Sequence, residues 1–224
     1  SSLESYTANL SGEIMELPAG YLAFATGYEK RWQSGYDQPD ALIAAGITSG
    51  NSRQPTSGDF SVEEFYLELA VPLLSDMPGV EQLDLELATR YSDYSNFGDT
   101  TNSKVGLKWR VNEDLIVRGT WSEAFRAPSL SELFLGNSDS FVTLQDPCNG
   151  GEAGNPNAPG CAGIPAGYQQ PNPQIRTTVG GNADLQPEEA ESFTYGFVYS
   201  PAQVEGLSIT FDVFDIEVDN AVST

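Results

Sequence analysis

Leu83-Asp84-Leu85-Glu86-Leu87 alternates apolar and acidic side chains at every step. Successive side chains of a β-strand point to opposite faces, so this stretch presents one apolar and one polar face. Leu207-Ser208-Ile209-Thr210-Phe211-Asp212 repeats the pattern near the other end of the sequence. Eight such stretches occur, and the segments that join them alternate between short and long. The sequence therefore predicts an all-β chain, an antiparallel up-and-down meander of about eight strands.

The spacing of turn residues supports this fold class. The chain has 224 residues with 22 Gly and 14 Pro, which favour turns and loops over helices. We expect only one helical turn, around Ser131 to Phe134. The long polar connectors are predicted at about 33–60, 92–103 and 127–186.

Period-two alternation is shared by two folds. In a β-sandwich the apolar faces turn inward onto a core, whereas in a transmembrane β-barrel they turn outward to lipid. Alternating short and long connectors favour the barrel. So do aromatic residues that recur at strand ends and suit a membrane interface, namely Tyr6, Tyr28, Trp109, Trp121 and Tyr199. A soluble or cell-surface β-sandwich binding module is the alternative.

The last stretch changes its apolar phase. After Val213 the apolar residues continue on the other parity, at Phe214, Ile216 and Val218. Either a β-bulge near Asp215 or a strand that leaves the membrane there accounts for the change.

The charge balance excludes several functions. Ten Lys and Arg stand against 32 Asp and Glu, a net charge of −22, and there is no His. Such a chain repels nucleic-acid phosphates, so we expect no nucleic-acid partner. Catalytic arrangements that need His are impossible. We predict that the chain is not an enzyme, and we expect neither a cofactor nor a metal.

The two cysteines, Cys148 and Cys161, lie in one stretch rich in Gly, Pro and Asn. Zinc is a poor alternative to a disulfide, since no His and no further Cys completes four ligands. We predict a Cys148–Cys161 disulfide, which indicates an oxidising compartment. No apolar run approaches the ~18 residues of a transmembrane helix. The chain begins within strand-like sequence, so we expect it to be part of a longer protein.

Four segments resemble the TonB-dependent outer-membrane receptors. Gly12 to Gly20, followed by Gly27 to Arg31, resembles a strand-turn-strand unit of that family. Arg118 to Ser129 contains the most distinctive run, Phe125-Arg126-Ala127-Pro128. Asn182 to Glu188 and Phe211 to Val218 resemble two late strands, and together the segments span almost the whole chain in family order.

The resemblance implies a barrel of 22 strands, of which residues 1–224 form a partial barrel domain. It also implies the outer membrane of a Gram-negative bacterium, and uptake of a scarce nutrient such as a siderophore, cobalamin or a glycan. The implied partners are outer-membrane lipid, a plug domain, the TonB complex that supplies energy, and a small-molecule or oligosaccharide ligand. This chain contains neither the plug nor the TonB box.

Two sets of candidate site residues follow. Charged residues on the polar parity are expected to face the lumen, chiefly Glu29, Arg31, Glu68, Arg110 and Arg118, where they most simply pair with one another or with the plug. Ligand contacts are expected from aromatic and acidic residues in the extracellular loops, for which the simplest alternative role is loop packing. The loop candidates are Tyr36, Asp37, Tyr94, Phe97, Phe141 and Tyr168.

Overall fold

The computed structural model describes residues 1–150, 160–165 and 167–222. These divide into two compact units. The first, which we call the wall, comprises Ser1–Gly35, Gly58–Leu133 and Ala183–Thr224. The second, the connector unit, comprises Tyr36–Ser57 and Phe134–Asn182.

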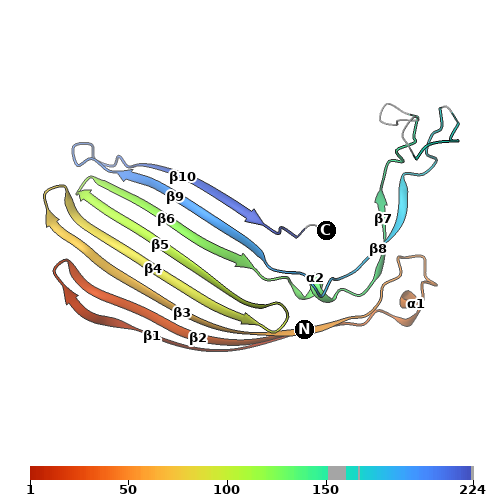
Figure 1. Cartoon of the computed structure of the whole chain (residues 1–224), viewed down its shortest axis with the longest axis horizontal. Coiled ribbons are helices and arrows are strands. Elements are labelled where there is room, and N and C mark those ends of the chain that lie inside the picture. The colour runs from red at the N-terminus through yellow and green to blue at the C-terminus, as the bar shows by residue number, and fades with distance from the viewer. Residues whose placement is uncertain (151–159, 166, 223–224) are drawn as a thin grey trace. The chain divides into compact units, whose positions relative to one another are not determined.

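Eight strands form one antiparallel sheet in the wall, in the order β1-β2-β3-β4-β5-β6-β9-β10 (Figure 1). Each strand pairs with its neighbour along the chain, except that β6 pairs with β9 across the longest connector. The sheet is open, and β1 and β10 are its two edges. The strands are β1 (Ser2–Leu17), β2 (Gly20–Asp37), β3 (Thr56–Met77), β4 (Val80–Tyr94), β5 (Gly98–Asn112), β6 (Leu115–Arg126), β9 (Glu188–Tyr199) and β10 (Ile209–Asp219).

The meander of about eight strands is therefore confirmed, and the short turns are tighter than the sequence suggested. Two residues join β1 to β2, β3 to β4, and β5 to β6. In the last of these turns Asn112 Oδ1 accepts hydrogen bonds from the backbone amides of Asp114 and Leu115. A positive φ of 77° at Gly79 suits the turn before β4, because glycine has no Cβ to clash there.

One expectation about strand boundaries is wrong. The connector predicted at 92–103 is only three residues long, because polar residues up to Tyr94 continue β4 and those from Gly98 begin β5. Of the two accounts of the change of apolar parity in β10, the β-bulge near Asp215 does not apply, because β10 pairs with β9 without a register shift. The shifts that do occur lie near the short turns, for example between Pro72 and Leu74.

The wall is one sheet thick, and its two faces differ. We call the face that carries Phe65, Leu87, Val105 and Tyr195 the apolar face, and the opposite one the polar face. Large side chains on the apolar face are uncovered, such as Phe65 at 54 % exposure and Tyr195 at 50 %. No second sheet of the described wall residues packs on them. A β-sandwich requires such a second layer, so the sandwich alternative is wrong.

The connector unit contains secondary structure that the sequence did not reveal. A hairpin of β7 (Ser138–Thr143) and β8 (Gln174–Val179) lies in the segment predicted as the 127–186 connector. The short helix α1 (Ala41–Ala44) lies in the other predicted long connector, 33–60. That segment is shorter than expected, since β2 continues to Asp37 and β3 begins at Thr56.

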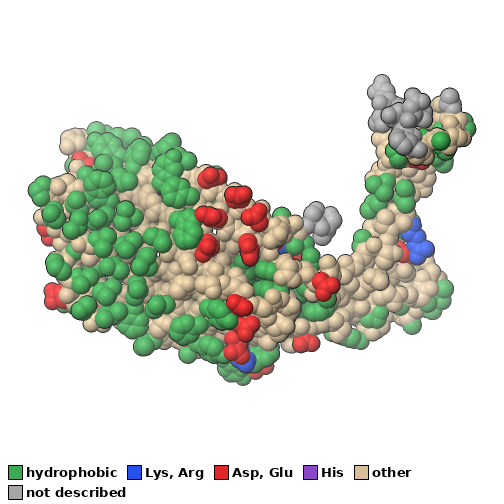
Figure 2. All heavy atoms as spheres, in the orientation of Figure 1, with side chains coloured by type: hydrophobic (Ala, Val, Ile, Leu, Met, Phe, Trp, Pro, Cys, Tyr) green, Lys and Arg blue, Asp and Glu red, His purple; other side chains and the backbone are tan. Residues whose placement is uncertain are grey.

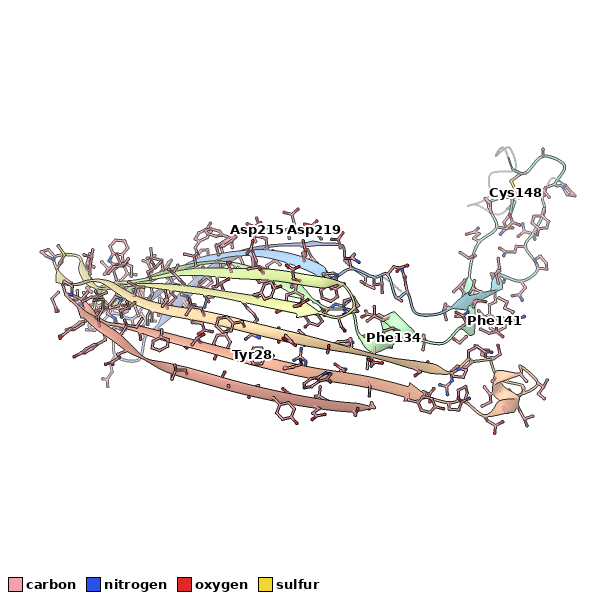
Figure 3. All side chains as sticks on the ribbon, turned by 60° about the horizontal axis from the view of Figure 1, so that its bottom comes forward. Tyr28, Phe134, Phe141, Cys148, Asp215 and Asp219 are labelled. Carbon is pink, nitrogen blue, oxygen red and sulfur yellow. A yellow bond between two sulfur atoms is a disulfide. The ribbon has the colours of Figure 1, made fainter. Side chains whose placement is uncertain are left out.

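Several links hold the connector unit together, and two of them join its segments most clearly. The backbone of Arg53 bridges that of Ser138, so the unit joins segments far apart in sequence. The predicted disulfide is present between Cys148 and Cys161, with Cα atoms 5.4 Å apart (Figure 3).

Neither α1 nor the five-residue α2 (Leu130–Phe134) is long and apolar enough to cross a membrane, nor is any other helix of the described residues.

Candidate functional site: the two faces of the wall

The apolar face carries a continuous row of cross-strand partners. Each partner pair is joined directly in the sheet register, so the row runs perpendicular to the strands. We call it the reference row, and it consists of Leu69, Leu87, Val105, Trp121, Phe193 and Asp215. Five of its members are apolar and the last is a carboxylate.

An acidic border limits the apolar face on the side of the long connectors. On β3 to β6, β9 and β10 it is the first acid of that face met on going from the apolar residues toward the long connectors. The border consists of Glu63, Asp93, Asp99, Glu123, Glu191 and Asp215. Figure 2 shows hydrophobic side chains gathered over the strand ends that carry the short turns, with a group of acidic side chains beside them.

The acidic border crosses the strands obliquely. On β3, β4 and β5 it lies six residues from the reference row, on β6 and β9 two residues, and on β10 it meets the row. At a rise of about 3.3 Å per residue and a strand spacing of about 4.8 Å, it moves about 20 Å along the strands over about 24 Å across them. Strands are therefore tilted by about 40° from the normal to the border, within the ~35–45° of transmembrane barrel strands.

Aromatic side chains near the strand ends donate hydrogen bonds through their polar groups, the indole N–H of Trp and the hydroxyl of Tyr. Trp109 Nε1 donates to the carbonyl of Gly79 at 3.0 Å, beside a short turn. At the acidic border Trp121 Nε1 donates to Glu191 at 2.6 Å, and the Tyr28 hydroxyl donates to Glu63 at 3.3 Å. An apolar ring with a hydrogen-bonded tip suits the zone between hydrocarbon and water.

All five charged residues that were predicted to face the lumen lie on the polar face of the sheet. Glu29 and Arg31 form an ion pair at 3.2 Å. Arg118 binds Asp212 through two hydrogen bonds, of 3.0 and 2.7 Å. Arg110 lies between Gln82 and Ile116 in the sheet. Opposite charges thus mix on this face, and most ion pairs among the described wall residues lie here, including that of Lys104 with Glu86.

Glu68 lines a hollow of about 410 Å³ on the polar face. Small side chains make room for it, and Glu86 and Lys104 lie beside it. The small residues are Ala23, Ala25, Ala70 and Ala88.

Tyr94, a predicted ligand contact, lies instead in a buried aromatic cluster at the end of β4. It is 6 % exposed and stacks on Phe97, another predicted contact, at 4.6 Å between ring centroids. Phe60 and Phe125 flank it at 6.0 and 5.8 Å. Burial and desolvation raise the pKa of the Tyr94 hydroxyl.

A buried carboxylate lies beside this cluster. Glu64 accepts a hydrogen bond from Ser92 at 2.7 Å, and its other oxygen lies 3.9 Å from Arg31 and 3.7 Å from Arg90. The two guanidinium groups offset the cost of burying the charge.

The other four loop candidates belong to the connector unit. Tyr36 is 65 % exposed and donates to Gln38, and Asp37 forms an ion pair with Arg53 at 3.3 Å. Phe141 is 48 % exposed on β7. Tyr168 accepts a backbone hydrogen bond from Gly150. Of the six candidates, the structure joins only Tyr94 and Phe97 by a described contact.

Sequence reasoning missed an ionic cluster where the longest connector leaves and rejoins the wall. Arg126, at the end of β6, binds both Glu132 of α2 and Glu188 at the start of β9. The spacing Ser129-x-x-Glu132 is a capping-box signature that could have located the helix start. Nothing in the sequence pattern paired Arg126 with Glu188. The described residues show no group of Cys, Asp and Glu side chains arranged to hold a metal ion.

Comparison with known proteins identifies the family. The sequence profile described as TonB dependent receptor-like, beta-barrel, matches residues 3–224. Among solved structures, the siderophore receptor PirA from Acinetobacter baumannii is similar with a TM-score of 0.58 and 15 % identity. The ferric enterobactin receptor mutant (Q482A) of PfeA from Pseudomonas aeruginosa, in complex with enterobactin, is similar with a TM-score of 0.63 and 17 % identity.

Each alignment covers 96 % of this chain but only 27 % of the solved receptor, so the chain spans about a quarter of their length. No protein among the curated sequences matches the chain. At these identities the solved structures show the fold, and the profile match over nearly every residue shows the family. The chain belongs to the TonB-dependent receptor-like β-barrel family.

Proposed function

We propose that this chain is part of the wall of an active-transport receptor in the outer membrane of a Gram-negative bacterium. The receptor binds a scarce nutrient at the cell surface and imports it. In this proposal the apolar face contacts lipid and the polar face lines the lumen. The long connectors lie on the extracellular side and the short turns on the periplasmic side, as is usual for outer-membrane barrels.

The oblique acidic border is the observation that carries the proposal. Carboxylates are excluded from hydrocarbon, so a border between apolar side chains and acids marks the edge of a bilayer. A tilt of about 40° is what barrel closure at this strand geometry requires. A surface patch for a protein partner would have no reason to follow that slope.

The polar face supports a filled lumen. Its charges of both signs are paired within the wall, as in Arg118 with Asp212, and the hollow beside Glu68 offers space to another part of the receptor. We propose that a plug domain occupies the lumen and that the TonB complex supplies the energy. Both partners come from the family rather than from contacts in this chain.

The ligand is proposed as a small molecule or oligosaccharide, with ferric siderophores as the first class to test. PirA is described as a siderophore receptor, and PfeA has been solved with enterobactin. Cobalamin and glycans are the other classes. Of the loop candidates, the exposed Tyr36 and Phe141 are accessible to a ligand, whereas Tyr94 is buried.

Uptake assays test this function directly. In a strain that lacks the gene for the full-length protein, we expect uptake of one radiolabelled compound from a panel of ferric siderophores, cobalamin and glycans to be lost. Restoring the gene should restore uptake, but not in a strain without TonB. Unchanged uptake across the panel, together with unchanged growth under iron limitation, would count against a transport role.

A further inference from the structure

Two of the segments that carry the family resemblance meet at one guanidinium group. Arg126 of Phe125-Arg126-Ala127-Pro128 is the last residue of β6, and Glu188, which follows Gln186-Pro187, is the first of β9, so a connector of 61 residues separates them. The register pairs these two residues directly on the polar face. Arg126 Nε donates to Glu188 Oε2 at 2.6 Å, and Nη2 donates to Oε1 at 3.0 Å.

The same guanidinium also binds the first helix of the connector. Arg126 Nη1 and Nη2 each donate to one oxygen of Glu132 at 3.0 Å. Glu132 in turn closes a capping box, since its Oε2 accepts from the Ser129 amide at 2.7 Å while its own amide donates to the Ser129 hydroxyl at 3.3 Å. Arg126 therefore donates four charge-assisted hydrogen bonds to two carboxylates, one on each arm of the connector.

Glu188 reaches a third segment. Its Oε1 also accepts the backbone amide of Val222 at 2.7 Å, just beyond the end of β10. The hydrogen bonds from Arg126 hold the pKa values of Glu132 and Glu188 at about 2, so both carboxylates remain charged at neutral pH.

Buried apolar residues fix the same corner. Leu133 of α2 is 2 % exposed, and Pro128 is among the most buried side chains of the described residues. Leu130 lies against Gly35 of β2, where an added Cβ would approach the leucine within 3.2 Å. The outgoing arm is thus anchored by packing and by Glu132. The returning arm is held by Glu188 and by Pro187, which is also buried.

Closing a connector of this length has an entropic cost that grows with the logarithm of its length. A contact between the two ends of the connector offsets that entropic cost. The residues between the ends are then free to vary in sequence. A bidentate Arg–carboxylate pair is suited to this role, because its planar geometry also fixes direction.

We propose that Arg126 is the positioning residue of the 127–187 connector, a clamp that joins its two arms through Glu132 and Glu188. The clamp sets where the connector leaves and rejoins the wall. This inference does not depend on the identity of the ligand or on transport.

The wall provides a matched control. Arg118 binds Asp212 with the same bidentate chemistry, and its side chain is 49 % exposed against 46 % for Arg126. Arg118 lies within the strands, away from the connector ends. Loss of a paired arginine can therefore be separated from loss of the clamp.

Hydrogen exchange of the full-length protein in detergent tests the clamp. In Arg126→Met we expect amide exchange to rise at least tenfold in residues 127–133 and 183–188, while β3 to β5 remain protected. Arg118→Met should leave both connector arms within twofold of the parent. A rise of the same size in Arg118→Met, or no rise in Arg126→Met, would overturn the proposal.

Exchanging the two charges of the pair gives a result that a purely structural role of Arg126 would not produce. Arg126→Glu alone should open both arms, and adding Glu188→Arg should recover at least part of the protection by reversing the pair. If Arg126→Met fails to fold, Glu188→Gln and Glu132→Gln decide the question. The first should open chiefly residues 183–188 and the second chiefly 127–133. Failure of the charge exchange together with unchanged exchange in both glutamine variants refutes the clamp.

Discussion

On the polar face of the wall, acidic and basic side chains lie side by side and form ion pairs. The few charged side chains of the apolar face are almost all acidic, and many of them lie along the acidic border. Of the ten Lys and Arg residues of the chain, Lys30 is the one on the apolar face, paired with the border residue Glu63 at 2.5 Å. Seven lie on the polar face, at Arg31, Arg90, Lys104, Lys108, Arg110, Arg118 and Arg126.

The difference supports the proposal that the two faces meet different surroundings. Paired charges of both signs suit a wet interior that must accommodate other protein, while an uncharged belt with acids only at its edge suits hydrocarbon bounded by water. Like charges even lie in direct register at that edge, as with Glu123, Glu191 and Glu217. Such neighbours are unfavourable in a sheet. Two of the three carboxylates accept hydrogen bonds that offset part of this cost, Glu191 from Trp121 and Glu123 from the amide of Ser103.

The largest effect is expected from a charge in the middle of the apolar face. Val105→Arg should destabilise the folded protein in phospholipid by about 2–4 kcal/mol, the cost of a cation near the bilayer midplane. Ala70→Arg is the control, because Ala70 lies on the polar face opposite Glu86. Unfolding free energies in lipid vesicles measure both, and equal costs would remove the distinction between the faces.

A change outside both faces should leave the wall intact. Replacing Cys148 and Cys161 by Ser removes a crosslink that is worth roughly 3 kcal/mol by the chain-entropy estimate. We expect faster proteolysis and hydrogen exchange in the described part of 134–182, with wall strands as protected as in the parent. Loss of protection in β3 to β5 would show that the wall depends on the connector unit.

The polar face should be destabilised by an added side chain at a glycine over which an ion pair passes. Arg118 on β6 reaches Asp212 on β10 over Gly196 of β9, and an added Cβ there would clash with Asp212 and with the backbone of Phe211. Gly196→Ala should cost about 1–3 kcal/mol of unfolding free energy, as other overpacking changes do. Gly106→Ala is the control, since its nearest neighbour would lie at an ordinary 3.5 Å. Equal unfolding free energies of the two variants would contradict the passage of the Arg118–Asp212 ion pair over Gly196.

The smallest effect belongs to the acidic border. Glu217→Gln removes one of three carboxylates in direct register and should stabilise the protein by a few tenths of a kcal/mol. The gain should shrink as salt is added, because surface repulsion is screened. Denaturant titrations at low and high ionic strength measure it, and a destabilisation that salt does not alter would indicate a partner for this carboxylate.

The alternation that begins at Leu83 was enough to predict the strands, their faces and the antiparallel meander, because side-chain period follows directly from backbone geometry. It was not enough to find where strands end. Asp93 and Asp99 were assigned to a connector because they are polar, yet β4 and β5 continue past the apolar region. The change of apolar parity after Val213 occurs without any shift in the backbone register.

The candidate site was harder to predict for a related reason. Parity placed Glu29 and Arg118 on the polar face, because only local periodicity was needed. Arg126 and Glu188 are brought together by the pairing of β6 with β9 across 61 residues, which no local pattern encodes. Tyr94 is a candidate because the sequence places it in a loop, and packing against Phe60 and Phe97 at the end of β4 buries it.

Spin labels on the reference row test the central claim most directly. Leu69 and Asp215 lie on this row at the same level across the sheet, yet the oblique border puts Leu69 inside the hydrocarbon and Asp215 at its edge. In the full-length protein in phospholipid vesicles, a label at position 69 should be relaxed by oxygen and one at 215 by a water-soluble nickel reagent. A label at Glu68, on the polar face, should not respond to oxygen as position 69 does. Equal accessibility of positions 69 and 215, or of 68 and 69, would contradict the assignment of the apolar face to lipid.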